Sequence, residues 1–533
     1  MVEPSPPDPA RAAALAPAIA ALEAGCFAEA EGRAAAWEAR DPEDVGAILV
    51  RGLALAAQGA AFRAAPLLHR VARARPGFAH PCRDLAALLP AAPAVVAAQF
   101  RACRRLAPQD DALTLAYADF LRDAGRPAPA ASVLRALLGR CPTLAAARKL
   151  YGMALLDLGL PGAAIAALRH AVALDPGDAA AWSNLGVVLK VEGRFAEAFD
   201  AHDRAVSLAP SDAQIRLNRA VARLRAGRMA AAWPDYESRL RLGPPRAGLP
   251  PARLLPGLLP DTPLRGRTVL AWHEEGFGDT ILFARYLPLL AARGARVVAL
   301  VPPELARLFA TLGGVAEILT VPAVLPEYDW HCPLFSLPRA FATTLDSIPA
   351  AIPYFRPDPE EVARWAPLLP EGGLRVGLVW AGQARPWLPG FAALDARRSM
   401  ALADLAPLAE VPGVRLISLQ KGPAAAQGRD LPPGMVLTDP MAGAADFADT
   451  AGLIAHVDVV VSVDTAVVHL AGALGKPVFL LDRYDNCWRW LAGRRDSPWY
   501  PTLRIFRQPA MGDWAPAVAA VTSALRDRTR LPL

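Results

Sequence analysis

Several features that mark common protein classes are missing from this sequence of 533 residues. The six cysteines include no C-x-x-C pair and none near a histidine at zinc-site spacing, so neither a disulfide framework nor a zinc site is expected. The most apolar stretch, 459–481, contains Asp464, His469 and Lys476, which the centre of a membrane span would exclude. The N-terminus lacks the basic start and apolar core of a secretory signal. We therefore expect a cytoplasmic protein with reduced cysteines.

An excess of charge of one sign is also missing. Lysine and arginine outnumber aspartate and glutamate by 57 − 51 = 6 on a long chain, and no dense basic run is present. Nucleic-acid binding is therefore not expected. Most basic residues are arginines, since the sequence has only four lysines: Lys149, Lys190, Lys421 and Lys476.

Proline and glycine, in contrast, are abundant, and in the first half they recur at a fixed period. Seven prolines follow one another at 34-residue intervals, apart from one interval of 32: Pro42, Pro76, Pro108, Pro142, Pro176, Pro210 and Pro244. Six of them have a glycine 17 residues earlier: Gly25, Gly59, Gly125, Gly159, Gly193 and Gly227. Segments of helical spacing lie between these marks. Because proline cannot continue a helix and glycine suits a tight turn, the period predicts repeated helix pairs.

This pattern resembles the tetratricopeptide repeat. The unit at 179–212 matches best, at Trp182, Leu185, Gly186, Ala205 and Pro210. Seven units are expected between Arg11 and Arg246, forming an all-α solenoid over residues 1–246. Each unit is stabilised by stacking on its neighbours, because alone it cannot bury its apolar face. The resemblance implies a concave surface that binds a protein or peptide; the alternative is a spacer or oligomerisation arm.

The pattern changes after a Pro-rich stretch, residues 247–266, which we expect to be a packed or semi-rigid linker. Beyond it, short β-branched runs alternate with helical segments, which predicts doubly wound parallel sheets. The predicted strands are Thr268–Trp272, Arg296–Val301, Arg375–Trp380, Val414–Leu419, Val457–Ser462 and Pro477–Leu481. The predicted helices are Thr280–Arg293, Pro303–Leu312, Ala444–His456 and Thr465–Leu474. Because this half is large for one sheet, we expect two Rossmann-like lobes, 267–370 and 371–533.

The first predicted strand leads into a candidate ligand site. Gly276 and Gly278 allow tight backbone turns, and Asp279 and Thr280 can cap the helix that follows. A helix start at the carboxyl end of a parallel strand is a common ligand site. The alternative for Asp279 is a plain helix cap.

A second group of polar residues follows the strand predicted at 457–462. Ser462, Asp464 and Thr465 crowd the turn, and His469 lies one helical turn further along the same face. An exposed helix start there would hold a diphosphate, with the polar side chains on ribose or phosphate. The alternative is a capping cluster beside a packed histidine.

A third candidate, the pair Gln420–Lys421, directly follows the strand predicted at 414–419. A departing diphosphate requires positive charge, which Lys421, Arg397 or Arg398 would supply. The alternative for Lys421 is a solvated surface cation.

Together these motifs resemble glycosyltransferase family 9, the heptosyltransferase-like group of GT-B fold, in the form that follows tetratricopeptide repeats. The layout is similar to that of O-GlcNAc transferases and bacterial flagellin glycosyltransferases. The resemblance implies metal-independent, inverting transfer from a nucleotide sugar, with the acceptor on the first lobe and the donor on the second. No D-x-D pair of the kind that holds a metal–diphosphate is present. The family pattern makes Asp279 the candidate general base and gives eight candidate donor contacts: Trp380, Arg398, Gln420, Lys421, Ser462, Asp464, Thr465 and His469.

One stretch departs from the family pattern. Residues 383–396, expected near the donor, are longer and more apolar than the usual Asn-Pro and short polar run, so the donor's identity and the enzyme's activity both stay open. The leading hypothesis is a transferase whose repeats recruit a protein acceptor, such as flagellin or another surface protein. One alternative is a non-catalytic scaffold with a degenerate transferase half. Another is a transferase acting on a glycan such as lipopolysaccharide.

Overall fold

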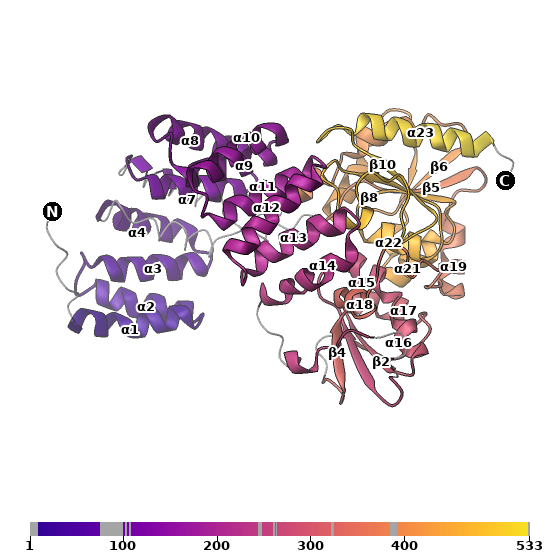
Figure 1. Cartoon of the computed structure of the whole chain (residues 1–533), viewed down its shortest axis with the longest axis horizontal. Helices are drawn as coiled ribbons and strands as arrows, with labels where there is room; N and C mark the ends of the chain where they lie inside the picture. The colour runs from indigo at the N-terminus through magenta and orange to yellow at the C-terminus, as the bar shows by residue number, and fades with distance from the viewer. Residues whose placement is uncertain are drawn as a thin grey trace. The chain divides into compact units, whose positions relative to one another are not determined.

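The computed structural model describes most of the chain (Figure 1). The described residues are 9–74, 97, 100–101, 104–105, 108–243, 248–258, 262, 264–320, 324–383 and 392–530. The chain divides into two compact units: the first holds the described residues up to Pro176 together with residues 392–394, and the second holds residues 177–383 and 395–530. The helical array therefore extends across both units, and its last helices belong to the unit that contains the sheets.

The first unit consists of paired helices with the predicted period. They are α1 (Pro9–Glu23), α2 (Phe27–Glu38), α3 (Val45–Ala57), α4 (Ala61–Ala74), α7 (Asp111–Asp123), α8 (Pro127–Arg140), α9 (Ala145–Asp157) and α10 (Pro161–Leu174). The predicted turn glycines of these pairs all have positive φ, between 69° and 76°: Gly25, Gly59, Gly125 and Gly159. Glycine adopts this conformation without the steric cost that other residues incur. The repeat predicted around Ala91 lies outside the described residues.

Small residues allow the two helices of a pair to cross closely. A Cβ on Gly152 of α9 would lie 2.6 Å from Leu168 Cγ of α10, and one on Gly52 of α3 would lie 2.9 Å from Leu68 of α4. Real Cβ atoms do not approach that closely, so larger residues would force the helices apart. Glycine at these two positions therefore lets the paired helices cross closely.

The second unit opens with two more helix pairs: α11 (Ala179–Val191), α12 (Phe195–Leu208), α13 (Ala213–Arg225) and α14 (Met229–Tyr236). Their turn glycines, Gly193 and Gly227, also have positive φ. The last helix is short, and Trp233 and Tyr236 at its end are buried in the core of the α/β region. The Trp233 indole N–H donates to the Thr343 carbonyl at 2.7 Å.

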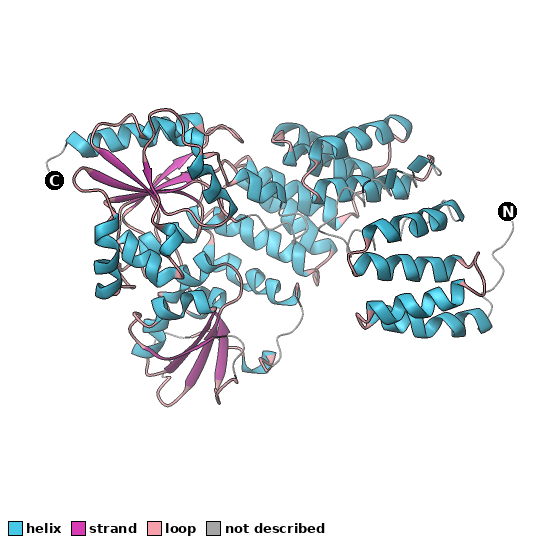
Figure 2. Cartoon of the chain, turned by 180° about the vertical axis from the view of Figure 1, so that it is seen from behind, coloured by secondary structure: helices cyan, strands magenta, loops and turns pink. Residues whose placement is uncertain are grey.

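Two parallel sheets follow, as predicted, and helices lie beside both (Figure 2). The first has the order β3-β2-β1-β4 and consists of β1 (Thr268–Trp272), β2 (Arg296–Val301), β3 (Val315–Thr320) and β4 (Trp330–Pro333). The second has the order β10-β9-β8-β5-β6-β7 and consists of β5 (Leu374–Val379), β6 (Val414–Ser418), β7 (Leu437–Thr438), β8 (Val459–Val463), β9 (Val478–Asp482) and β10 (Leu503–Arg507). Both sheets are apolar on both faces, as buried parallel strands require.

Helices and short 3-10 turns cover the sheets. The α-helices are α15 (Phe277–Ala284), α16 (Leu287–Ala292), α17 (Pro303–Phe309), α18 (Leu337–Ala340), α19 (Pro359–Trp365), α20 (Ala392–Arg397), α21 (Phe447–Ile454), α22 (Ala466–Ala473) and α23 (Ala515–Arg530). The 3-10 turns are η1 (Glu237–Arg241), η2 (Pro251–Arg253), η3 (Leu334–Ser336), η4 (Ala366–Leu368), η5 (Leu402–Leu408), η6 (Pro423–Arg429), η7 (Met441–Gly443) and η8 (Trp488–Trp490). The helix predicted at 280–293 is two helices, because Pro288 has no N–H to donate to the preceding turn.

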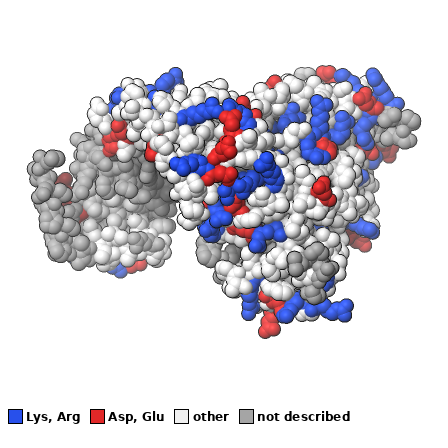
Figure 3. Space-filling view, viewed as in Figure 1, with Lys and Arg blue, Asp and Glu red and all other residues white. Residues whose placement is uncertain are grey.

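The Pro-rich stretch packs on the first sheet where it is described. Leu255 and Leu258 are buried, and the Leu255 N–H donates to the His331 carbonyl at 2.8 Å. Leu249 packs against the sheet face formed by Leu270 and Trp272. On the surface of the described residues, positive and negative side chains are interspersed on the face shown in Figure 3, as expected from the absence of a basic run.

Candidate active site

Two helix starts, one from each sheet, meet at the candidate site. Helix α15 follows β1, and α22 follows β8. A Cβ on Gly278 of α15 would lie 3.1 Å from Ala466 Cα and 2.7 Å from His469 Cδ2, both on α22. Gly278 therefore serves close helix packing. Neither Gly276 nor Gly278 has a positive φ, so their role differs from the predicted tight turns.

Asp279 lies in the first turn of α15 and forms an ion pair with Arg489 of η8. The two side chains are largely buried, with 19% and 11% of their surfaces exposed. The N-cap position belongs to Gly276, and the Thr280 hydroxyl donates back to the Gly276 carbonyl at 3.2 Å. Asp279 is thus not the helix cap that the alternative interpretation assumed.

The surroundings of Asp279 tune its acidity. Burial raises its pKa to about 7, the Arg489 guanidinium opposes this rise, and the carboxylates of Glu275, Asp464 and Glu274 add to it. A carboxylate with a pKa near neutrality can take a proton from a hydroxyl and release it again at physiological pH.

Arg489 is the functional candidate that sequence reasoning missed. Its guanidinium lies over the Trp488 ring at 4.9 Å, and Nη1 donates to Cys487 Sγ at 2.8 Å. Asp279 and Cys487, with Tyr236 and Asp464, raise its pKa well above the usual value, although burial opposes this. The visible signal was an arginine between two tryptophans shortly after a buried strand, since cations often lie over aromatic faces.

At the start of α22 the polar side chains bond mainly to one another. Ser462 Oγ donates to the Val463 carbonyl at 2.7 Å and bonds the Thr465 hydroxyl at 3.2 Å. Thr465 occupies the N-cap position, but its side chain accepts no capping hydrogen bond. Within the described part of the chain, the backbone amides of Ala466 and Val467 have no hydrogen-bond acceptor. This helix start therefore presents free N–H groups, the arrangement that binds anions.

Asp464 and His469 differ in how they are held. The Asp464 carboxylate is half-buried and forms neither an ion pair nor a hydrogen bond with any described residue. His469 is buried, its Nδ1 bonds the Tyr500 hydroxyl at 3.1 Å, and its ring stacks on Trp490 at 5.1 Å. Burial holds its pKa well below the usual range, so the ring is neutral. This geometry favours the packed histidine of the alternative interpretation.

The candidate side chains at the ends of β5 and β6 mostly form hydrogen bonds with backbone groups. Gln420 Oε1 accepts from the amides of Trp380 and Ala381 at 3.0 and 2.9 Å, and its Nε2 donates to the carbonyls of Ala381 and Lys421. Trp380 is fully buried.

The two predicted cations of this region also bond to backbone carbonyls. The exposed Lys421 ammonium donates to the Ala444 carbonyl. Arg398 donates to the Gln383 carbonyl at 2.7 Å and pairs with Asp395. Residues 384–391 of the departing stretch lie outside the described residues.

Further cations gather at the end of β9. Arg397 pairs with Asp485 at 3.1 Å. Arg483 lies 3.6 Å from Asp485, and its buried Nε and Nη1 form no hydrogen bond among the described residues. Lys190 of α11 lies near this group: burial and the Arg225 charge together lower its pKa to about 8, while Asp485 opposes the shift. Unsatisfied buried N–H groups favour an anionic partner.

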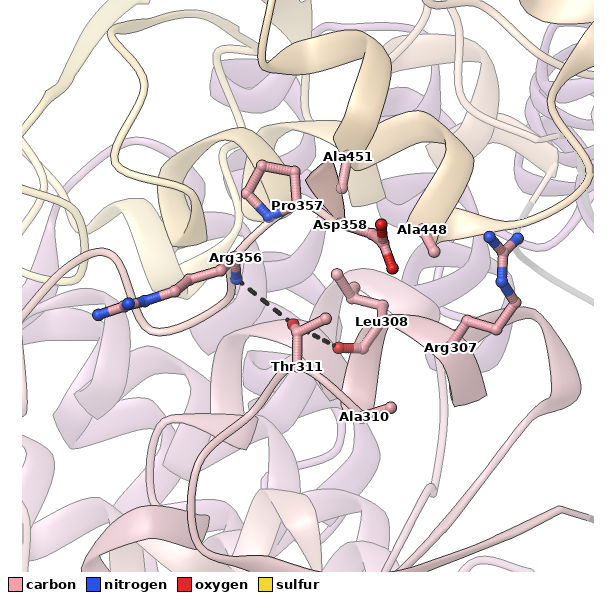
Figure 4. Close-up of a pocket in the computed structure, with 9 residues that line it drawn as sticks. All are labelled: Arg307, Leu308, Ala310, Thr311, Arg356, Pro357, Asp358, Ala448 and Ala451. Atoms are coloured by element: carbon pink, nitrogen blue, oxygen red, sulfur yellow. Dashed lines mark hydrogen bonds between the residues drawn. The ribbon is translucent and has the colours of Figure 1, made fainter. Parts of the chain in front are cut away.

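A pocket of about 280 Å³ lies elsewhere, on the side of α17 (Figure 4). Arg307, Thr311, Arg356 and Asp358 line it, together with small apolar residues of α21. Arg307 is engaged by Asp446, Asp449 and Glu361. None of the site residues predicted from the sequence lines this pocket.

Comparisons with known proteins agree with this architecture. Residues 151–213 match the tetratricopeptide repeat, and residues 414–492 match glycosyltransferase family 9 (heptosyltransferase). The segment that matches glycosyltransferase family 9 follows, along the chain, the segment that matches the tetratricopeptide repeat. The family match includes Gln420, Asp464 and Arg489, whereas Asp279 lies outside it.

Individual relatives resemble parts of this chain. Protein FlbA of Caulobacter vibrioides is 29% identical over 298 residues, covering 50% of this chain and 47% of FlbA. This chain thus spans about half the length of that curated relative. The E. coli ADP-heptose lipopolysaccharide heptosyltransferase II structure is 14% identical, with a TM-score of 0.36, and covers 50% of this chain and 100% of its own. A Thermobaculum terrenum O-GlcNAc transferase variant is 15% identical, with a TM-score of 0.27, and the match covers 78% of this chain and 91% of that structure's chain.

Among the described residues, no helix combines the length and the apolar character needed to cross a membrane. Nor do three or more His, Cys, Asp or Glu side chains converge there as metal ligands would.

Proposed function

We propose that this protein transfers a sugar from a nucleotide-sugar donor to an acceptor hydroxyl, with inversion at the anomeric carbon. The observation that carries the proposal is the buried Asp279 carboxylate at the start of α15, a helix that packs through Gly278 against the free start of α22. The family match of the second lobe gives the class of reaction. The pairing of a base with an anion site is what a transfer from a diphosphate donor requires.

In this proposal Asp279 is the general base. It takes the proton of the acceptor hydroxyl as that oxygen forms a bond to the anomeric carbon. The bond from that carbon to the diphosphate oxygen breaks, and the nucleoside diphosphate leaves with the electron pair. A single displacement of this kind inverts the carbon. The pKa of about 7 fits a base that must be ionised before the step and protonated after it.

The leaving diphosphate would be bound by the amides of Ala466 and Val467 at the start of α22. Positive charge near this edge is available from Arg489, Arg483 and Lys421. Helix starts and fixed cations stabilise a developing anion most strongly where water is excluded. We therefore assign charge neutralisation to the chain itself rather than to a metal ion. Activity retained in a chelator would support this assignment.

The other predicted donor contacts divide into two groups. In this proposal Asp464, Ser462 and Thr465 contact the ribose or phosphate of the donor. Gln420 and His469 use their side-chain bonds to hold the ends of β5 and of α22, so in this proposal they position the backbone that binds the donor. Arg398 and Trp380 act in the same way near the end of β5.

For the acceptor we propose a protein recruited by the repeats, because a helical array offers an extended surface for a polypeptide. The heptosyltransferase description of the matching family favours a second candidate, a glycan acceptor such as lipopolysaccharide. Deleting the gene separates the two: glycosylation is lost from a protein in the first case and from lipopolysaccharide in the second.

The decisive test is a panel of nucleotide sugars offered to the purified full chain, with binding measured by calorimetry and transfer by mass spectrometry of candidate acceptors. We expect one donor to bind and transfer. Asp279→Asn should bind the same donor without transferring, whereas Asp346→Asn, at an exposed carboxylate, should behave as wild type. Absence of binding by every donor would favour the non-catalytic scaffold.

A further inference from the structure

The last two repeats hold the segment that carries Arg489. We name residues 483–492, which follow β9 and include η8 and the two residues after it, the anchor loop. Arg225 at the end of α13 donates from Nε to Asn486 Oδ1 at 2.6 Å and from Nη2 to the Tyr484 carbonyl at 3.3 Å. In return, the Ala492 N–H donates to the Arg225 carbonyl at 2.9 Å. The repeat helix and the anchor loop are therefore joined at both ends of the loop.

Neighbouring repeat residues reinforce this junction. The third arm of the Arg225 guanidinium donates to the Lys190 carbonyl of α11, so the same side chain also joins two repeat helices. The Tyr484 hydroxyl donates to Glu192 Oε1 at 2.9 Å. Trp488 meets the ring of Trp233 edge-on at 6.0 Å. Arg225 itself is only 5% exposed, so its bonds are made away from competing water.

Within the loop, the connection from Arg225 to Arg489 is short. Asn486 accepts from Arg225 and donates from Nδ2 to the Leu491 carbonyl at 2.7 Å, which closes the loop around residues 487–490. Cys487 Sγ accepts a hydrogen bond from Arg489, and the Arg489 guanidinium forms the ion pair with Asp279. The anchor loop therefore sets the position of the Arg489 guanidinium relative to Asp279, and the loop itself is held by the repeat helix α13.

We propose that Arg225 is a positioning residue for the transfer step, acting through the anchor loop to keep Arg489 on Asp279. This inference rests on the proposed function of Asp279 as general base. It makes the last two repeats part of the machinery of transfer, and not only a surface that recruits an acceptor. A lysine would not replace Arg225, since a single ammonium cannot bond three acceptors held in a fork.

The proposal predicts a change in pH dependence. The groups facing Asp279 are Arg489 and Cys487 from the anchor loop, Glu274 and Glu275 before α15, Asp464 after β8, and Tyr236 of α14. Of these, Arg489 is the cation that lowers the pKa of Asp279. Loosening the anchor loop weakens that effect, so the acidic limb of the activity profile should move to higher pH.

The test compares Arg225→Ala, Arg225→Lys and Asn486→Ala in the full chain. The matched control is Arg223→Ala on the same helix, where Asp235 keeps its bonds to Arg216 and Arg219 and the loop is untouched. We expect kcat to fall about 10- to 100-fold in the three variants, the cost of a small misplacement in an active site, with donor KM changed less than threefold. The acidic limb of the pH–rate profile should move to higher pH in each of these three variants, and the Arg223→Ala control should match the wild type.

A second readout does not depend on activity. Cys487 is partly buried and bonded to Arg489, so its alkylation rate reports the position of the loop, with the exposed Cys26 as internal reference. We expect severalfold faster labelling of Cys487 in Arg225→Ala and Asn486→Ala, and no further gain in the double variant. Equal labelling, kcat and pH profile in Arg225→Ala and Arg223→Ala would overturn the proposal. If the wild type transferred no sugar, the proposed function would fail by itself, and unchanged labelling would still overturn the role of Arg225.

Discussion

The starts of α15 and α22 show how one sequence pattern produces two chemical environments. Each follows a buried parallel strand, and each carries an Asp-Thr pair, Asp279–Thr280 and Asp464–Thr465. Asp279 is paired with Arg489 and has a pKa raised to about 7, whereas Asp464 has no partner among the described residues. The pattern places a carboxylate at a sheet edge, and the elements packed around it decide what the carboxylate does.

The largest effect that would separate the two aspartates is on the chemical step. Asp279→Asn keeps the shape of the side chain and removes the proposed base, so kcat should fall about 10²- to 10⁴-fold with donor affinity nearly unchanged. Single-turnover kinetics and calorimetry on the same preparation would measure both. Retained kcat in this variant would assign the base to another group and end the distinction drawn between the two helix starts.

The next largest effect is expected on removing Arg489, the ion-pair partner of Asp279. Arg489→Met removes the charge that lowers the pKa of Asp279, so that pKa should rise further above its present value of about 7. At pH 7 most of the base would then be protonated, and the rate should fall by about 10-fold or more, recovering as the pH is raised. A pH–rate profile for kcat would measure this. A loss of rate that was the same at every pH would show that Arg489 acts on the leaving group alone.

The smaller activity effect is expected at the second aspartate. If Asp464 accepts a hydrogen bond from the donor, Asp464→Asn should weaken donor binding about 10-fold, the typical worth of one charged hydrogen bond. Because the Asp464 charge raises the pKa of Asp279, its removal should move the acidic limb to lower pH, opposite in sign to Arg489→Met. Calorimetry with the donor and a pH–rate profile would check both. If the acidic limb of the pH–rate profile moved to higher pH instead, the electrostatic coupling between Asp464 and Asp279 would be contradicted.

Sequence reasoning located both helix starts, because the strand and helix periods around them are strong. β1 and β2 have the bounds that their β-branched runs predict. Four strands were not predicted: β4 and β7 because they are short, and β3 and β10 because charged residues interrupt their apolar runs. Arg489 could not be joined to Asp279 from the sequence, since packing between the lobes brings the two motifs together. The same holds for His469, whose neutral, stacked state depends on Trp490 and Tyr500 arriving from later segments.

The smallest effect, on stability alone, concerns how the start of α22 is capped. A Thr at the N-cap usually contributes about 1 kcal/mol by accepting from the first-turn amides. Thr465 accepts no such bond, so Thr465→Ala should lower the free energy of unfolding by less than about 0.5 kcal/mol. Asp44 at the start of α3 does accept from the Ala47 amide at 2.9 Å, so Asp44→Ala should cost about 1 kcal/mol in the same denaturant titration. A large loss at Thr465 would mean that its side chain satisfies the amide of Val467, which would then not be free for an anion. A small loss, combined with a rise in melting temperature on adding nucleoside diphosphate, would mean that this helix start gets its cap from the ligand.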